Sequence, residues 1–131
     1  MGDFVRDPVA RVQAGFDAYA RNDYDAVIAT MHPDVEVLPS GDQPAIWGRK
    51  AVRQWLEPDA FVRQDVELLE ARPVGEKLLS RHRARAYGAT SGIEIEFELW
   101  SVWTYDDAGL VTRWEMYSPD ERDEAFASAG V

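Results

Sequence analysis

The sequence predicts an α+β domain in which helices come first, a mostly antiparallel sheet follows and a short helix closes the chain. Apolar residues recur at helical spacing in three separate segments between residues 8 and 56. From about residue 65 to residue 118, polar and apolar residues alternate along longer segments, which is typical of strands. Turn sequences separate these segments at short intervals. Helices followed by consecutive antiparallel strands define the α+β class.

Three helices are predicted before the main sheet. Asp7 caps the first, which covers residues 8–21 and carries a proline in its first turn. The second covers residues 24–31, and a proline two residues further on ends it. A short strand over residues 35–39 and a helix over residues 49–56 complete this half of the chain.

Four strands of an antiparallel meander are predicted next, at about residues 65–73, 77–87, 93–105 and 110–118. A Gly-rich turn over residues 88–92 joins the second of these strands to the third. Residues 119–129 then form the closing helix.

The hairpin of the second and third strands has two faces of different chemistry. With the turn centred at residues 89–90, the register pairs three arginines with three glutamates: Arg81, Arg83 and Arg85 with Glu98, Glu96 and Glu94. Because successive side chains of a strand point to opposite faces, this register also sets the other face. That face is mostly apolar and carries Ser80, His82, Ala84 and Ala86 against Ile93, Ile95, Phe97, Leu99 and Ser101. We expect a ligand to lie on the apolar face.

Composition excludes several classes of function. A length of 131 residues and an apolar fraction of 46% fit one globular domain, which we expect to span residues 1–131. No cysteine is present, which excludes thiolate nucleophiles, disulfides and zinc–thiolate sites. The net charge of −10 argues against nucleic acid as a partner, because phosphate binding needs a basic surface. No apolar run approaches the ~18 residues of a membrane span, so we expect a cytoplasmic protein with no membrane contact.

Four segments carry motifs of one known family: FDAYARNDYDAVIATMHPDVEVLPSG at 16–41, WGRKAVRQWL at 47–56, SGIEIEFELWSVWTYDDAGLVTRWEMY at 91–117 and DERDEAFASAGV at 120–131. In this order they resemble the SnoaL-like branch of the nuclear-transport-factor-2-like superfamily. The resemblance covers nearly the whole chain. It implies a cone in which a curved sheet wraps around the first helix, a ligand enters the open end and the convex face forms a dimer interface.

The resemblance leaves the chemistry open, because this fold serves isomerases, cyclases, epoxide hydrolases, dehydratases and non-catalytic binding domains. Ketosteroid isomerases of this fold use a tyrosine, an aspartate base and a protonated aspartate. The matching positions here are Gly15 or its neighbour Phe16, Pro39 and Ser101. All three groups are missing, so ketosteroid isomerisation by that mechanism is not expected.

His82 is the residue that best suits acid–base catalysis. A histidine that titrates near neutral pH transfers protons readily, and the register places His82 on the inward face across from Phe97. Ser80 and Ser101 would then orient the oxygen of a substrate. The alternative is a core histidine that hydrogen-bonds Ser80 or a backbone carbonyl.

Glu115 is a second catalytic candidate. Related epoxide hydrolases and cyclases place an acidic residue on the last strand, where the inward position here is Met116 and the nearest acid is Glu115. Alternation points Glu115 outward beside Arg113 and Tyr117. A bulge of one residue would turn it inward.

Aromatic side chains are expected around the pocket. Trp103 and Trp114 share the inward parity, and they line a cavity or pack in the core. Trp47 and Trp55 flank the third predicted helix and would close the mouth of the cavity. The predicted substrate-binding residues are Ser80, Phe97, Leu99, Ser101, Trp103, Trp114, Met116, Trp47, Trp55, Phe16 and Tyr19.

A homodimer is predicted through the convex face of the sheet. Trp100, Val102 and Tyr117 share that face, and an exposed tryptophan there would be costly. The arginine–glutamate pairs would frame the contact; alternatively, they form a solvated charged face.

The sequence therefore predicts a pocket for a small hydrophobic molecule. One hypothesis is an isomerase, cyclase or hydrolase that works by acid–base chemistry without a cofactor. The others are a non-catalytic ligand-binding or accessory dimeric domain and a dimer whose cavity is vestigial. No metal site is expected, because His32 and His82 lie far apart in the sequence and make no recognisable ligand set.

Overall fold

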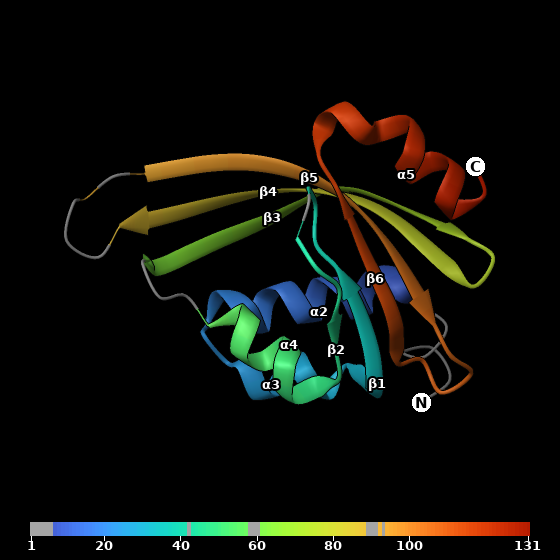
Figure 1. Ribbon diagram of the computed structural model, residues 1–131, viewed down its shortest axis with the longest axis horizontal. Coiled ribbons are helices and arrows are strands. Elements are labelled where there is room, and N and C mark those ends of the chain that lie inside the picture. Colours follow the sequence, from blue (N-terminus) through green and yellow to red (C-terminus); the bar gives the residue numbers. More distant parts are fainter. Residues whose placement is uncertain (1–6, 42, 58–60, 89–91, 93) are drawn as a thin grey trace.

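The computed structural model describes residues 7–41, 43–57, 61–88, 92 and 94–131. It shows a long, curved sheet with helices on both of its sides (Figure 1). The helices of the first half of the chain lie against the concave side, and the C-terminal helix lies against the convex side. The predicted α+β class is therefore correct. The turn predicted at residues 88–92 falls largely outside the described residues.

Among the described residues, the helices of the first half are α2 (Pro8–Ala20), α3 (Tyr24–Ala29) and α4 (Arg49–Leu56). The Asp7 carboxylate caps α2 by accepting the backbone N–H of Ala10 at 3.1 Å, as the sequence predicts. Helix α3 ends two residues earlier than expected, because the chain enters the sheet as soon as Met31.

In the part of the chain that the structure describes, the sheet has six strands in the order β2-β1-β6-β5-β4-β3. Their bounds are β1 (Met31–Leu38), β2 (Ile46–Trp47), β3 (Phe61–Val74), β4 (Lys77–Gly88), β5 (Glu94–Tyr105) and β6 (Val111–Tyr117). The predicted meander corresponds to β3–β6, and its neighbours pair antiparallel. Strand β1 adds to it in parallel with β6, which makes the sheet mixed.

Strand β1 begins earlier than the predicted residue 35 and contains Pro33. Its pairing with β6 is interrupted between Met31 and Glu36, so Pro33 lies where no regular ladder runs. A proline is tolerated in a strand at such an irregularity, because its missing N–H breaks no ladder bond.

The hairpin register differs from the predicted one by two residues. Arg83 pairs with Glu98 and Arg85 with Glu96, while Arg81 stands opposite Trp100. The predicted turn centre was one residue too early. Because the shift along the pair is an even number of residues, every side chain keeps its predicted face.

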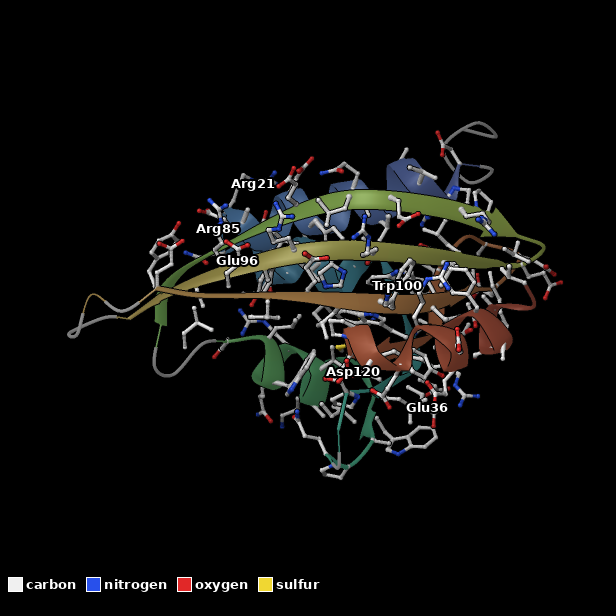
Figure 2. All side chains as sticks on the ribbon, turned by 90° about the horizontal axis from the view of Figure 1, so that it is seen from above. Arg21, Glu36, Arg85, Glu96, Trp100 and Asp120 are labelled. Atoms are coloured by element: carbon white, nitrogen blue, oxygen red, sulfur yellow. The ribbon has the colours of Figure 1, made fainter. Side chains whose placement is uncertain are left out.

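The charged face is an array of exposed and half-exposed ion pairs (Figure 2). Arg85 Nε lies 2.9 Å from Glu96 Oε2. Arg83 lies within 3.6 Å of both Glu96 and Glu98. Pairs in contact with water contribute little to stability, about 0–1 kcal/mol each.

Buried apolar side chains lie on both sides of the sheet. The larger cluster lies between the concave face and the helices of the first half, and Val35, Val37 and Val52 are fully buried within it. The smaller cluster lies between the convex face and α5 (Arg122–Ala129), which follows a 3-10 turn over Pro119–Glu121.

The convex face is where the sequence prediction needs correction. Trp100 is only 7% exposed and Val102 is fully buried, because α5 of the same chain covers them. The rings of Trp100 and Phe126 meet edge to face, with centroids 5.1 Å apart. Figure 2 shows Trp100 on the strand beside α5. Because Trp100 is already buried, it needs no partner subunit to cover it. The homodimer itself stays a prediction.

None of the helices in the described part of the chain is long and apolar enough to cross a membrane. Within the same described residues, no group of three or more histidine, aspartate or glutamate side chains is placed to hold a metal ion.

Candidate functional site

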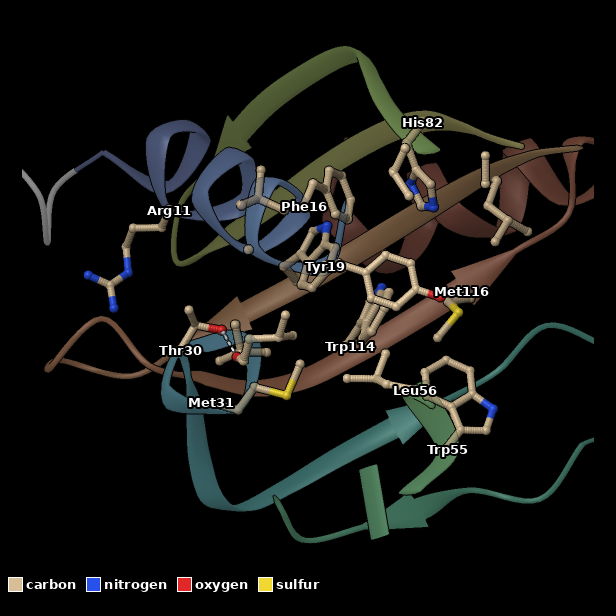
Figure 3. A pocket seen from close by; sticks show the side chains of 18 of the residues that line it. Arg11, Phe16, Tyr19, Thr30, Met31, Trp55, Leu56, His82, Trp114 and Met116 are labelled. Carbon is tan, nitrogen blue, oxygen red and sulfur yellow. Dashed lines mark hydrogen bonds between the residues drawn. The ribbon is translucent and has the colours of Figure 1, made fainter. Parts of the chain in front are cut away.

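A cavity of about 290 Å³ lies between the helices and the concave face of the sheet. Residues of α2, α3 and α4 form one side of it, and inward residues of β3, β4, β5 and β6 form the other (Figure 3). Its wall is largely apolar and aromatic. The polar side chains on the wall, apart from the indole groups, are Arg11, Tyr19, Thr30, His82 and Tyr105.

Six of the predicted aromatic or apolar contacts lie on this wall beside Phe16 and Tyr19 of α2. They are Phe97, Leu99, Trp103, Trp114, Met116 and Trp55. The sequence found them because strand parity and helix spacing identify the inward face without knowledge of the register.

Trp103 and Trp114 form the centre of the wall. Their rings are stacked, with centroids 4.4 Å apart and an angle of 13° between the planes. Trp55 of α4 meets Trp114 edge to face at 5.8 Å, and Phe16 meets Trp103 at 5.9 Å. These contacts join α2 and α4 to the sheet through aromatic rings, and they leave a preformed apolar surface beside the cavity.

Ser80 and Ser101 do not line the cavity, contrary to the prediction. Both are fully buried and stand opposite each other on β4 and β5. Trp103 Nε1 donates a hydrogen bond to Ser80 Oγ at 2.8 Å, and Trp114 Nε1 donates one to Ser101 Oγ at 3.0 Å. The serines therefore satisfy the indole N–H groups and fix the tryptophan rings, instead of meeting a ligand.

His82 lies on the cavity wall and is 5% exposed. Its ring packs against Phe16 with centroids 4.9 Å apart. Its Nδ1 atom is buried and has no hydrogen-bond partner among the described residues, so the alternative of a bond to Ser80 does not hold. Burial lowers the pKa of His82 from 6.5 to about 4. The imidazole is therefore neutral at pH 7, and it does not titrate near neutral pH as the sequence analysis expected.

Glu115 lies on the other side of the sheet from the cavity. No bulge occurs at this position, because Val102 pairs with Glu115 and Trp103 with Trp114 in regular register. The carboxylate is 6% exposed and accepts hydrogen bonds from Tyr117 Oη at 2.8 Å and Ser128 Oγ at 2.7 Å. It joins β6 to α5, and the structure gives it no access to a ligand in the cavity.

Trp47 also lies away from the cavity. It is 63% exposed on the two-residue strand β2, at the edge of the sheet. The prediction that it closes the mouth beside Trp55 is wrong for this residue, since flanking a helix in sequence does not fix the direction in which a side chain points.

Three polar residues of the wall, Arg11, Thr30 and Tyr105, were not predicted from the sequence. Tyr105 shares the inward parity of Trp103, so alternation would have identified it. Its Oη atom is buried without a hydrogen-bond partner in the described part of the chain. Burial raises the pKa of Tyr105, and the charge of Arg11 opposes that rise. Arg11 is 8% exposed and lies one helical turn before Gly15 on the inner side of α2.

Solved structures share this fold at low sequence identity. A putative polyketide cyclase from Xanthomonas campestris is 22% identical, with a TM-score of 0.74 over 93% of this chain and 96% of that one. A Mycobacterium tuberculosis protein in complex with estradiol-17β-hemisuccinate is 19% identical, with a TM-score of 0.74 over 82% of this chain and 90% of that one. An LEH-like epoxide hydrolase from Mycobacterium tuberculosis is 18% identical, with a TM-score of 0.73 over 93% of this chain and 90% of that one.

At these identities the likeness shows the fold alone. No curated protein matches the sequence. The profile of the SnoaL-like domain matches residues 12–114, which include every helix and strand that borders the cavity except the first residues of α2 and the end of β6. The chain therefore belongs to the SnoaL-like domain family.

Proposed function

We propose that this protein binds a small hydrophobic molecule in the cavity between α2, α4 and the concave face of the sheet. A concave, mostly apolar site with a few polar groups is the usual form of a small-molecule site. The estradiol ester bound by the Mycobacterium tuberculosis structure of the same fold supports a ligand of this class.

The observation that carries the proposal is the state of His82. A neutral imidazole lies on the wall of an apolar cavity with its buried Nδ1 unpaired among the described residues. An unsatisfied buried polar atom costs about 1–3 kcal/mol. A ligand hydroxyl or carbonyl that reaches this atom would remove the penalty, whereas purely structural packing leaves it in place.

A binding screen with hydrophobic metabolites tests the proposal, with the fluorescence of the wall tryptophans and the shift of the melting temperature as readouts. Ala84→Leu fills the cavity beside His82, and Trp47→Ala changes an exposed tryptophan outside it. We expect Ala84→Leu to weaken binding at least tenfold and Trp47→Ala to leave it unchanged. Equal affinity for the wild type and Ala84→Leu would place binding elsewhere and refute the proposal.

A second candidate function is acid–base catalysis by His82 without a cofactor, as in an isomerase, cyclase or hydrolase. It is favoured by the same unpaired Nδ1 atom, because the neutral imidazole keeps a ring nitrogen that can accept a proton. A ligand that is converted by the wild type, and that His82→Gln binds but does not convert, supports catalysis. Binding without conversion by either protein identifies a non-catalytic binding domain.

A further inference from the structure

His82 and Tyr105 line the cavity, and each carries a buried polar atom that has no hydrogen-bond partner within the described residues. One is His82 Nδ1 on β4, and the other is Tyr105 Oη near the end of β5. Native proteins pair nearly all of their buried polar atoms with protein, water or ligand. Two unpaired atoms on one apolar cavity therefore point to two polar positions on whatever fills it.

The two atoms belong to opposite ends of the cavity. His82 pairs with Leu99, and Tyr105 lies six residues further along the same strand. At ~3.3 Å per residue, the two positions are separated by roughly 20 Å along the strand direction before side-chain reach and strand twist shorten the span. In Figure 3, His82 lies on the opposite side of the view from Arg11, the residue whose charge acts on Tyr105.

Apart from the hydroxyl of Tyr19, the wall between these ends offers little polar chemistry. Trp103 and Trp114 donate their indole N–H groups to buried serines, so their rings present only apolar surface. At the far end, the Thr30 hydroxyl is occupied by its bond to the Val27 carbonyl at 2.6 Å. The hydroxyl at that end that can bond a ligand is therefore the one of Tyr105. The buried cation of Arg11 acts on Tyr105 and favours an electron-rich ligand oxygen as the acceptor of the tyrosine hydrogen bond.

We infer that the cavity selects elongated ligands with an apolar body and one oxygen at each end. The hydroxyl of Tyr105 donates a hydrogen bond to the oxygen at one end. The His82 imidazole forms a hydrogen bond with a hydroxyl or carbonyl at the other end. This inference rests on the proposed function, because it specifies which hydrophobic molecules the site prefers. The opposing explanation is that buried water satisfies both atoms, in which case oxygens on the ligand give no advantage.

A series of rigid rods tests the inference through the ligand. Biphenyl and p-terphenyl are each used with no, one or two terminal hydroxyl groups, and the dissociation constants are measured by quenching of tryptophan fluorescence. We expect each hydroxyl to tighten binding by about tenfold in the rod of matching length. Because the comparison is made on the wild-type protein, it does not depend on the folding of any variant.

Two variants then test whether Tyr105 and His82 are the residues that bind the ligand oxygens at the two ends of the cavity. Tyr105→Phe is expected to bind the diol no more tightly than the wild type binds the mono-ol, and His82→Phe to behave likewise. The matched control is Tyr87→Phe, which changes a tyrosine of β4 that does not line the cavity. Diol binding that is unchanged in both wall variants would overturn the inference.

The outcomes separate the inference from the proposed function. If the hydrocarbons bind as tightly as their diols, the two-ended preference is wrong, while the hydrophobic site stands. If no rod of either length binds with any degree of hydroxylation, both the preference and the hydrophobic site are refuted.

Discussion

Ser101 Oγ accepts a hydrogen bond from Trp114 Nε1 at 3.0 Å, beneath the wall of the cavity. Ser80 holds Trp103 in the same way on the neighbouring strand. The two indole rings then stack on each other, and Phe16 of α2 and Trp55 of α4 meet them in edge-type contacts. The aromatic wall is therefore positioned by polar atoms that do not themselves meet the ligand.

Ser101→Ala tests this arrangement. The substitution leaves the buried Trp114 N–H without an acceptor, which we expect to lower the free energy of unfolding by about 1–3 kcal/mol. Urea denaturation measures the change. The double variant Ser101→Ala/Trp114→Phe removes both partners, so the serine change should cost less in that background than in the wild type. Equal costs in both backgrounds would show that the hydrogen bond contributes nothing.

The lowered pKa of His82 predicts a pH-dependent stability. The unfolded state takes up a proton near pH 6.5 and the folded state only near pH 4, so the unfolded state holds more protons between these values. The contribution of His82 is therefore fully present above pH 6.5 and is lost as the pH falls toward 4, by roughly 3 kcal/mol in total.

This pH effect is measured by comparing the wild type with His82→Gln in urea denaturation between pH 4 and pH 7. The stability difference between the two proteins should change across this window. His32→Gln, the same substitution at the other histidine of the chain, is the control. A difference that stays constant from pH 4 to pH 7 would show that His82 is not shielded from water.

The hydrogen bonds of Glu115 predict that this residue of the outer face contributes to stability and not to ligand binding. Glu115→Ala removes the acceptor shared by Tyr117 and Ser128, so we expect α5 to loosen and stability to fall by about 1–3 kcal/mol. Hydrogen exchange of α5 amides measures the loosening, and Glu124→Ala on the exposed side of α5 is the control. Ligand affinity should not change. A large loss of affinity at unchanged stability would return Glu115 to the list of binding residues.

The homodimer remains a prediction with a changed physical basis. Since α5 covers Trp100 and Val102, the convex surface left for a partner is the charged array around Arg83. We expect light scattering to give about twice the chain mass of 14.8 kDa, and Arg83→Glu to shift the mass toward one chain. A monomeric mass for the wild type would reject the dimer.

The sequence predicted the inward and outward faces of the sheet well, because side-chain alternation survives an error in the turn. It placed Trp103, Trp114 and His82 on one face although the register was displaced by two residues. It could not show what covers a face, so Trp100 was assigned to a partner although the packing of α5 buries it.

The polar details of the site were harder to predict, because they depend on pairs distant in sequence. Ser80 meets Trp103 across 23 positions, and no local pattern distinguishes an indole acceptor from a ligand contact. The titration of His82 likewise depends on burial by the ring of Phe16 and its other neighbours, which are supplied by the assembled fold.

The most direct test of a ligand site at His82 is the imidazole ¹⁵N signal of this residue during a titration with 4,4′-dihydroxybiphenyl. The chain has one other histidine, His32, which lies outside the cavity and serves as an internal reference. We expect a saturable change in the His82 Nδ1 shift while the His32 signals stay fixed. Saturable binding that leaves the His82 signals unmoved would contradict it.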